Sequence, residues 1–210
     1  MSLRFVITGT DTNVGKTIFS AALAHALSAH YWKPIQSGLC GETDSETVIR
    51  LGGIPKARIL PEIWKFNTPV SPHLAAKLDQ VTLDLEQLTL PSIHSPLIIE
   101  GAGGLLVPLT SNVVFADIFA KWQVPVILCA RTELGTINHT LLSIEAMRKR
   151  AIPIFGVVFI GNEQLDTQNT IAELGSINVL GRVPWCNPLS SANLHQSFQE
   201  NFSVSTFVGI

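Results

Sequence analysis

Hydrophobic positions near the start of the chain follow two different spacings in turn. Residues 3–8 form a short apolar run rich in branched and aromatic side chains, which is typical of a buried strand. Residues 16–29 instead place Phe19, Ala22 and Leu23 on one face of a helix. The chain is therefore expected to begin with a strand, a loop and a helix.

The same alternation continues along the chain. Apolar runs bounded by glycines, prolines or polar clusters predict strands, and stretches with helical spacing predict the helices between them. The prolines between residues 54 and 72 predict mostly connection there, and the periodicity after Pro184 is too weak to predict an element. The predicted strands are 3–8, 31–35, 97–100, 124–129, 154–160 and 179–183, and the predicted helices are 16–29, 44–51, 83–88, 115–122, 137–150 and 167–174.

These elements predict an α/β protein. Strands that are apolar along their whole length and alternate with helices indicate a mostly parallel central sheet covered by helices on both faces. Of the 210 residues, 46% are hydrophobic and 14% are charged, which is enough apolar material for one extensive core. No repeat or linker interrupts the pattern, so residues 1–210 are expected to form a single domain.

Charge and hydropathy exclude several classes of partner. A net charge of −2 and a pI near 6.3 indicate no excess of positive charge that would bind a nucleic acid. The mean hydropathy is +0.33, but the longest apolar stretches are shorter than the roughly 18 residues of a membrane-spanning helix. The cysteines and histidines are too scattered for a disulfide framework or a zinc site. A cytoplasmic protein that binds neither nucleic acid nor membrane is expected.

Candidate chemistry starts in the loop between the first strand and the first helix. The stretch "GTDTNVGKT", residues 9–17, would aim backbone N–H groups and the positive end of a helix at an anion. Lys16 would reach the β- and γ-phosphates of a nucleotide, and the Thr17 hydroxyl would bind Mg²⁺. The common phosphate loop has glycine at the place of Thr10, whereas this chain carries Gly9 one step earlier. The alternative is an ordinary glycine turn with a solvated lysine.

Further polar residues stand at predicted strand or helix ends, where an open parallel sheet binds its ligands. Glu100 ends an apolar strand before a glycine turn and would be either a Mg²⁺ ligand or a solvated carboxylate. Asp44 precedes a helix, and from spacing alone a helix cap is the simpler interpretation. Lys33 would be either a second cation near the phosphates or a surface lysine. Residues 135–140, "GTINHT", start a helix that would bind a carboxylate or phosphate, or no ligand.

Taken together, the motifs resemble those of a known family. "TGTDTNVGKT", "YWKPIQSG", "IIEGAGGLLVPL", "LGTINHTLLS" and "GRVPW" occur in the order and approximate spacing of dethiobiotin synthetases, which belong to the P-loop NTPase superfamily. Many ATPases share the phosphate loop alone, but its combination with the lysine strand, the EGAGG turn and the LGTINH helix start is far more specific. The resemblance implies the three-layer P-loop NTPase fold.

The resemblance also implies an ATP-dependent ligase of biotin biosynthesis. An amine of 7,8-diaminononanoate would capture CO₂ as a carbamate, the carbamate would take the γ-phosphoryl group of ATP, and the second amine would close the ring. Dethiobiotin, ADP and phosphate would result. Each step places negative charge on phosphoryl or carboxyl oxygens, which lysines and Mg²⁺ stabilise. A homodimer is implied as well, with a helix start of one subunit holding the substrate carboxylate of the other.

Roles follow from the resemblance for the residues that match its motifs. Lys16 and Lys33 would be catalytic, and the Mg²⁺ ligands would be Thr17, Asp44 and Glu100, with ATP as co-substrate. The substrate-binding residues would be Ser37, Gly135, Thr136, Ile137 and Asn138. The nucleotide-binding residues would be Asn13, Val14, Gly15, Lys16, Thr17, Ile18, Asp44, Glu100, Gly101, Ala102 and Gly103, with Pro184, Trp185 and Cys186 beside the adenine.

Some positions depart from the family's motifs. Ile160 stands where the family commonly has a base-binding asparagine, with Asn162 two residues later, and Glu133 stands where a lysine is common. The nucleotide preference is therefore open.

A ParA/MinD-like nucleotide switch is a competing class of protein, but its loop carries an additional lysine that residues 10–12 lack. An amidating ligase of cobalamin synthesis would need a further domain to supply ammonia.

Overall fold

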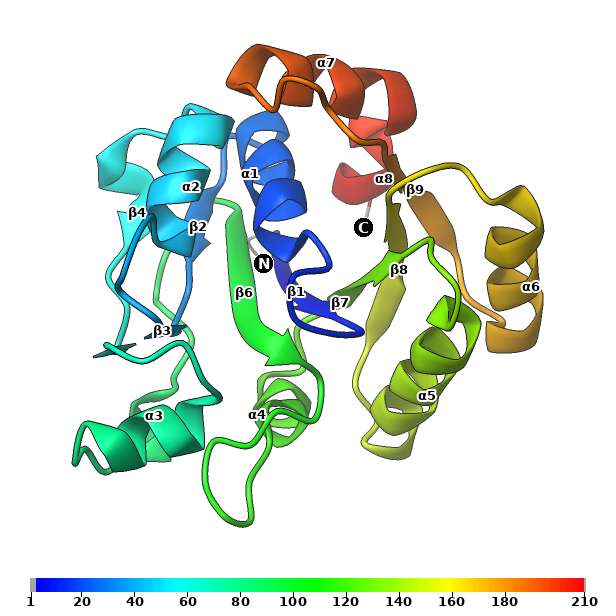
Figure 1. Ribbon diagram of the computed structural model, residues 1–210. Coiled ribbons are helices and arrows are strands. Elements are labelled where there is room, and N and C mark those ends of the chain that lie inside the picture. Colours follow the sequence, from blue (N-terminus) through cyan, green and yellow to red (C-terminus); the bar gives the residue numbers. More distant parts are fainter. Residues whose placement is uncertain (1–2, 210) are drawn as a thin grey trace.

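The computed structural model describes residues 3–209, which form an α/β fold (Figure 1). Its strands are β1 (Arg4–Gly9), β2 (His30–Trp32), β3 (Ile35–Ser37), β4 (Ile59–Leu60), β5 (Trp64–Phe66), β6 (Leu97–Gly104), β7 (Val126–Arg131), β8 (Ile154–Ile160) and β9 (Val179–Val183). Its α-helices are α1 (Lys16–Ala26), α2 (Asp44–Gly52), α3 (Pro72–Leu78), α4 (Phe115–Trp122), α5 (Thr136–Lys149), α6 (Leu165–Gly175), α7 (Ser191–Asn201) and α8 (Val204–Val208). Short 3₁₀ helices cover Lys56–Arg58 and Leu85–Gln87.

A parallel sheet is the centre of the molecule. Within residues 3–209 it has seven strands in the order β4-β2-β6-β1-β7-β8-β9, and each neighbouring pair is parallel. Parallel neighbours need crossover connections, and the helices supply them. The carboxyl ends of β1, β2 and β6 therefore lie next to one another at the same edge of the sheet.

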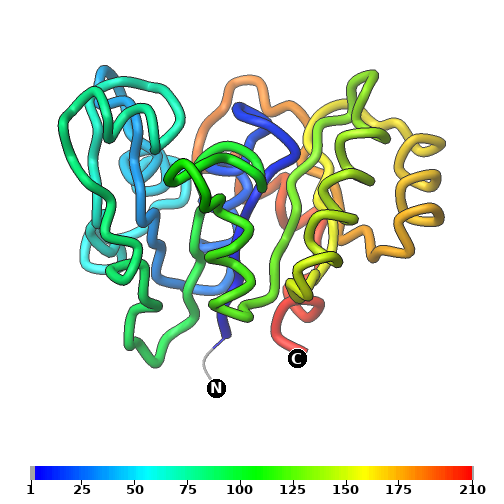
Figure 2. Tube along the Cα trace, turned by 90° about the horizontal axis from the view of Figure 1, so that it is seen from below, coloured from blue at the N-terminus to red at the C-terminus, as the bar shows by residue number. Residues whose placement is uncertain are grey.

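Helices cover both faces of the sheet, as the sequence predicts. Along β1, Phe5 and Ile7 pack in one core cluster beneath α1, α2, α7 and α8, whereas Val6 packs in the other cluster against α4, α5 and α6. This is the period-2 alternation of a strand that is buried on both sides. In Figure 2, α4 and α5 lie in front of the strands and α1 lies behind them.

The predicted strand 31–35 is in fact two strands in two sheets. β2 ends at Trp32 and pairs with β4 and β6, whereas β3 begins at Ile35 and pairs with β5. Pro34 lies between them, and proline has no N–H to donate to a strand ladder. Its carbonyl oxygen accepts hydrogen bonds from the N–H groups of Ile63 and Trp64. The break leaves Lys33 at the point where the chain passes from one sheet to the other.

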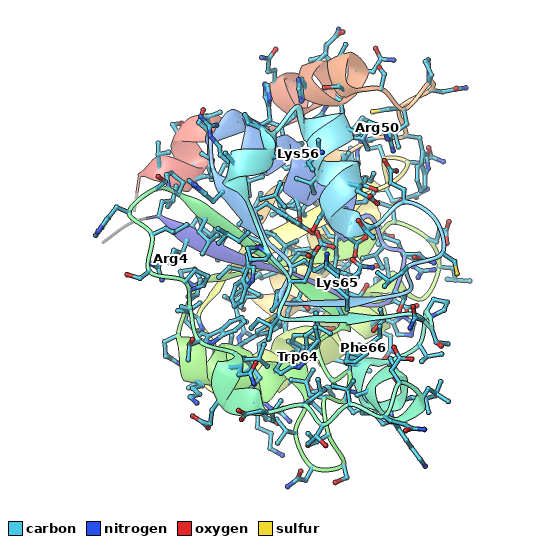
Figure 3. The ribbon with its side chains drawn as sticks, turned by 90° about the vertical axis from the view of Figure 1, so that its left-hand side faces the viewer. Arg4, Arg50, Lys56, Trp64, Lys65 and Phe66 are labelled. Carbon is cyan, nitrogen blue, oxygen red and sulfur yellow. The ribbon has the colours of Figure 1, made fainter. Side chains whose placement is uncertain are left out.

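The segment 54–72 is also more structured than predicted. It contains β4 and β5, and α3 begins at its last proline, Pro72. Proline is favoured at the first helical position, since the N–H it lacks would have no helical partner there. Trp64 and Phe66 of β5 point to the buried side and Lys65 points away (Figure 3). Of the predicted helix 83–88, only the 3₁₀ helix Leu85–Gln87 forms.

The segment after Pro184 folds back over the sheet as α7 and α8. Leu194 and Phe198 of α7 and Phe207 of α8 are buried in the same cluster as Phe19 of α1. This aromatic contact explains why a segment of weak periodicity is ordered. Among the described residues, no helix has the length and apolar character needed to cross a membrane.

Candidate active site

Two glycines shape the loop between β1 and α1. A Cβ at Gly9 would lie 2.7 Å from the Val14 side chain, so a larger residue would force a shift there, and this packing explains the glycine at position 9. Gly15 has a φ of +94°, and a Cβ there would lie 2.8 Å from Ile160. Gly15 is also the N-cap of α1, so the unpaired N–H groups of the first helical turn adjoin the loop. Such a loop suits an anion.

Three oxygen-bearing side chains from three elements meet beside this loop. The Thr17 hydroxyl, in the first turn of α1, lies 3.0 Å from Asp44 Oδ1 and 2.7 Å from Glu100 Oε1. Asp44 is the first residue of α2, and Glu100 is in β6. The hydroxyl has one hydrogen and donates it to one of these carboxylates at a time. The donor set consists of hard oxygens, which fits Mg²⁺.

Asp44 is not the cap of its helix, contrary to the simpler interpretation of the sequence. Thr43 is the N-cap of α2: its hydroxyl accepts the Glu46 N–H at 3.3 Å, and the Glu46 carboxylate accepts the Thr43 N–H at 2.8 Å. The Asp44 N–H donates to Gln36 Oε1 at 3.3 Å. The Asp44 carboxylate is therefore left to face Thr17 and Lys33.

Lys33 is buried and not a surface lysine. Its side chain is 4% exposed, and Nζ lies 2.5 Å from Asp44 Oδ2 and 3.3 Å from Glu100 Oε1. Burial by itself would lower the pKa of Lys33, but the charges of Glu100 and Asp44 outweigh it, so the pKa is raised and the ammonium stays protonated. In return, Lys33 holds the pKa of Asp44 below its usual value despite the burial of that carboxyl group.

Lys16 folds back across the phosphate loop. Its Nζ donates to the Asp11 carbonyl oxygen at 3.1 Å, and the side chain is 7% exposed. Burial lowers the pKa of Lys16, and the nearby charge of Glu100 restores it only in part. An anion with several charges would raise that pKa again, because its negative charge favours the protonated ammonium.

These residues line a cleft of about 630 Å³. Its lining is mixed, with charged and polar side chains as well as apolar ones. The Ser37 hydroxyl oxygen is buried at this cleft without a hydrogen-bond partner among the described residues, so it is available to a ligand. The lining residues include Asn13, Gly15, Lys16, Thr17, Ile18, Lys33, Ser37, Asp44, Glu100, Ala102 and Gly103, together with Pro69, Val70, Pro72 and Val107.

Val14 and Gly101 lie directly behind the cleft. Val14 is buried against Gly9 within the loop, and the Gly101 carbonyl oxygen accepts a hydrogen bond from Lys33 Nζ at 3.4 Å. Val14 thus supports the phosphate loop, and Gly101 contributes to the position of the Lys33 side chain.

Two predicted segments do not line this cleft. Residues 135–138 begin α5, where the Thr136 hydroxyl donates to the Arg131 carbonyl oxygen at 2.6 Å. Residues 184–186 follow β9, and the Trp185 side chain is 67% exposed. A second cleft of about 480 Å³ lies on the other side of Thr12 and Val107, between the phosphate loop and α5.

Comparison with known proteins identifies the family. A family described as an AAA domain matches residues 4–193. The ATP-dependent dethiobiotin synthetase BioD of Agrobacterium fabrum is 60% identical to this chain over 210 residues, which is 100% of this chain and 99% of the relative. The chain belongs to the dethiobiotin synthetase family. The protein of the same name from Brucella ovis is 58% identical with the same coverage.

The fold of the chain is that of P-loop NTPases, as predicted. The MinD cell division protein of Aquifex aeolicus matches with a TM-score of 0.53 at 12% identity, over 93% of this chain and 87% of that one. A ParA family ATPase from Chlorobium tepidum matches with a TM-score of 0.52 at 11% identity, over 95% and 91%. At such identities the likeness shows a shared fold alone, so it does not favour the nucleotide-switch alternative.

Sequence reasoning missed two residues that contact the carboxylate-bearing residues Asp44 and Glu100. Gln36 accepts the Asp44 N–H, and the fully buried Tyr31 donates from its hydroxyl group to Glu100 Oε2 at 3.0 Å. Burial and the neighbouring Glu100 raise the pKa of Tyr31 well above its usual range, so the phenol keeps its proton. A signal was present in the sequence, because residues two apart on a strand share one face, and Tyr31 stands two residues before Lys33.

Proposed function

We propose that this chain converts 7,8-diaminononanoate, CO₂ and ATP into dethiobiotin, ADP and phosphate. The observation that carries the proposal is a single cleft in which Lys16, Lys33 and the oxygens of Thr17, Asp44 and Glu100 adjoin the phosphate loop. It occurs in a chain 60% identical over its full length to a protein named ATP-dependent dethiobiotin synthetase. Because the reaction consumes ATP, a cytoplasmic location is proposed with it.

The proposed reaction has three steps. One amine of the substrate attacks CO₂, which forms a C–N bond and releases a proton, and a carbamate results. A carbamate oxygen attacks the γ-phosphorus of ATP, the bond to ADP breaks, and a carbamic–phosphoric anhydride forms. The second amine attacks the carbonyl carbon, phosphate leaves with the C–O bonding electrons, and the ring closes with loss of a proton. Each step needs negative oxygens held in place and neutralised.

The chain's own residues supply that positioning and charge. Lys16 and the N–H groups of residues 13–18 would bind the nucleotide phosphates, together with residues 100–103. Lys33, which is protonated and buried between two carboxylates, would neutralise the carbamate and the transferred phosphoryl group. Thr17, Asp44 and Glu100 would hold Mg²⁺, which supplies Lewis-acid stabilisation of phosphoryl oxygens when bound.

The remaining contacts would come from residues at the rim of the site. The unpartnered Ser37 hydroxyl supports a contact with the substrate, and the apolar side chains of Pro69, Val70 and Pro72, which also line the cleft, suit a hydrocarbon chain. Residues 184–186 would lie beside the base, with the exposed Trp185 ring available for stacking. Ile160 is 5% exposed and packs against Gly15, whereas Asn162 is exposed.

We also propose a homodimer with the active sites at its interface. Gly135, Thr136, Ile137 and Asn138 do not line the cleft of their own chain, so a second copy would have to bring them to the substrate. Exposed leucines support this proposal. Leu134 is fully exposed, and Leu106 and Leu142, which line the second cleft, are 53% and 55% exposed.

The proposed activity is tested by measuring ADP release by the purified protein with MgATP and bicarbonate, with and without 7,8-diaminononanoate. The expected result is ADP release that depends on the diamine, together with an organic product that has the mass of dethiobiotin. ATP hydrolysis that is indifferent to the diamine would contradict the proposal. Replacing ATP by other nucleoside triphosphates in the same assay measures the nucleotide preference.

A further inference from the structure

Tyr31 reaches the active site from within the sheet. β2 runs parallel to β6, with Tyr31 opposite Ile98 and Trp32 opposite Ile99. Tyr31, Ile98 and Glu100 therefore share the face that α1 covers, and Tyr31 and Ile98 lie in the same core cluster. Strands rise by about 3.3 Å per residue, so Glu100 lies about 7 Å beyond Ile98, a span that a tyrosine side chain can bridge.

The two oxygens of Glu100 have different partners. Oε1 faces Thr17 Oγ1 at 2.7 Å and Lys33 Nζ at 3.3 Å, on the side of the cleft. Oε2 faces the Tyr31 hydroxyl at 3.0 Å, on the side of the core. Glu100 and Tyr31 are 1% and 0% exposed, so water does not compete for this bond. The hydrogen bond from the phenol therefore restrains the orientation of the Glu100 carboxylate, with one oxygen toward the core and the other toward the cleft.

We propose that Tyr31 is a positioning residue that orients the Glu100 carboxylate toward Thr17 and the divalent ion. The proposal rests on the proposed role of Glu100 as a ligand. Partners behind a ligating carboxylate commonly change metal affinity or activity by about tenfold to a hundredfold. If the phenol only satisfied a buried polar group, its loss would affect stability but not the affinity for the ion.

The test uses Tyr31→Phe, which removes the hydroxyl group and keeps the ring packed. Mn²⁺ binding is measured by electron paramagnetic resonance in the presence of a non-hydrolysable ATP analogue, and kcat and KM for the diamine are measured with MgATP. The expected result is about tenfold weaker Mn²⁺ binding and a lower kcat, with KM for the diamine little changed. Mn²⁺ affinity equal to that of the unmodified protein would overturn the proposal.

Ser20→Ala is the matched control. Ser20 is a fully buried residue of α1 whose hydroxyl has no partner among the described residues, so its loss removes a buried hydroxyl without touching a carboxylate. Mn²⁺ affinity should stay unchanged in this variant. A loss as large as that of Tyr31→Phe would show a general effect of core substitution and would overturn the proposal.

The variant Glu100→Gln distinguishes the positioning role of Tyr31 from the metal-binding role of Glu100. If Tyr31 acts through Glu100, the double variant should bind Mn²⁺ as weakly as Glu100→Gln alone, because the two effects are not independent. Additive losses would overturn the positioning role while leaving Glu100 a ligand. Unchanged binding in Glu100→Gln would instead overturn the metal role of Glu100, and the role of Tyr31 with it.

Discussion

At the scale of single residues, the charge balance of the site depends on the ion pairs of Lys33 with Asp44 and Glu100. Its ammonium lies between the carboxylates of Asp44 and Glu100, and Glu100 is only 1% exposed. Removing one member of a buried ion pair leaves the other charge uncompensated in a medium of low polarity. Lys33 is therefore a structural residue as well as a proposed catalytic one.

Lys33→Ala is expected to abolish turnover and to lower the free energy of unfolding by about 3 kcal/mol. Urea denaturation and diamine-dependent ADP release measure the two effects. Lys121→Ala is the control, since Lys121 is 55% exposed and its contact with Glu86 is a surface ion pair of 3.4 Å, which contributes little. Near-normal turnover in Lys33→Ala would remove Lys33 from the mechanism.

Gly15→Ala is expected to weaken nucleotide binding. An alanine there would be strained at a φ of +94° and would press against Ile160 at 2.8 Å, so the loop would have to move. Gly41→Ala is the matched control, because Gly41 has a φ of +110° but open space around its missing Cβ. Calorimetric titration with an ATP analogue should show a loss of affinity in Gly15→Ala only. Equal affinities in the two variants would contradict the steric argument.

At the scale of elements, the start of α4 predicts a dependence of stability on pH. Asp117 accepts the Val114 N–H at 2.9 Å and pairs with Arg150 at 3.0 Å, and the hydrogen bond and the ion pair hold the pKa of Asp117 below its usual value of 3.8. A lowered pKa means that the folded state favours the ionised carboxylate. The stabilisation is thus present above about pH 4 and is lost as the pH falls through the folded-state value.

Asp117→Asn should therefore be less stable than the unmodified protein at pH 6, and the difference should shrink below about pH 4. The side chain is 42% exposed, so the difference at pH 6 should stay below about 1 kcal/mol. Urea denaturation across this pH range measures it. Asp166→Asn is the control, since Asp166 is an exposed residue in the first turn of α6. A difference that grows at low pH would contradict the argument.

At the scale of the whole molecule, we propose that residues 1–210 fold as one domain. β1 from the start of the chain lies between β6 and β7, so the two halves of the sequence share one sheet. The expected outcome is a single cooperative transition in urea, coincident by fluorescence and circular dichroism. Two separate transitions would contradict it.

The proposed dimer is tested at the same scale. Leu142→Glu, on α5, should shift the protein toward monomers in sedimentation velocity and raise KM for the diamine, because a charge would enter an apolar interface. Leu174→Glu is the control, as Leu174 is 68% exposed on α6, away from the second cleft. A fully active monomer of the unmodified protein would contradict the shared site.

Much of this architecture could be predicted from local patterns. The strand–loop–helix at the start, the helix at 115–122 and the strand at 154–160 were predicted with their observed types, because burial on both faces makes strands apolar throughout. The predictions failed at prolines in two opposite ways: the segment 54–72 was predicted to be mostly connection, and the strand 31–35 was predicted to continue through Pro34. Pro72 begins a helix, and Pro34 divides a predicted strand between two sheets.

The sequence by itself determined the types of the main strands and helices of the central sheet, the phosphate loop and the family motifs, since each depends on residues close together in the chain. Only the tertiary structure decided that Lys33 is buried, that Asp44 faces Thr17, and that Tyr31 holds Glu100. The physical reason is distance along the chain: Thr17 and Glu100 are 83 residues apart, and Tyr31 and Glu100 are 69 apart. They meet because β6 lies between β1 and β2, and that strand order is set by the packing of the whole chain.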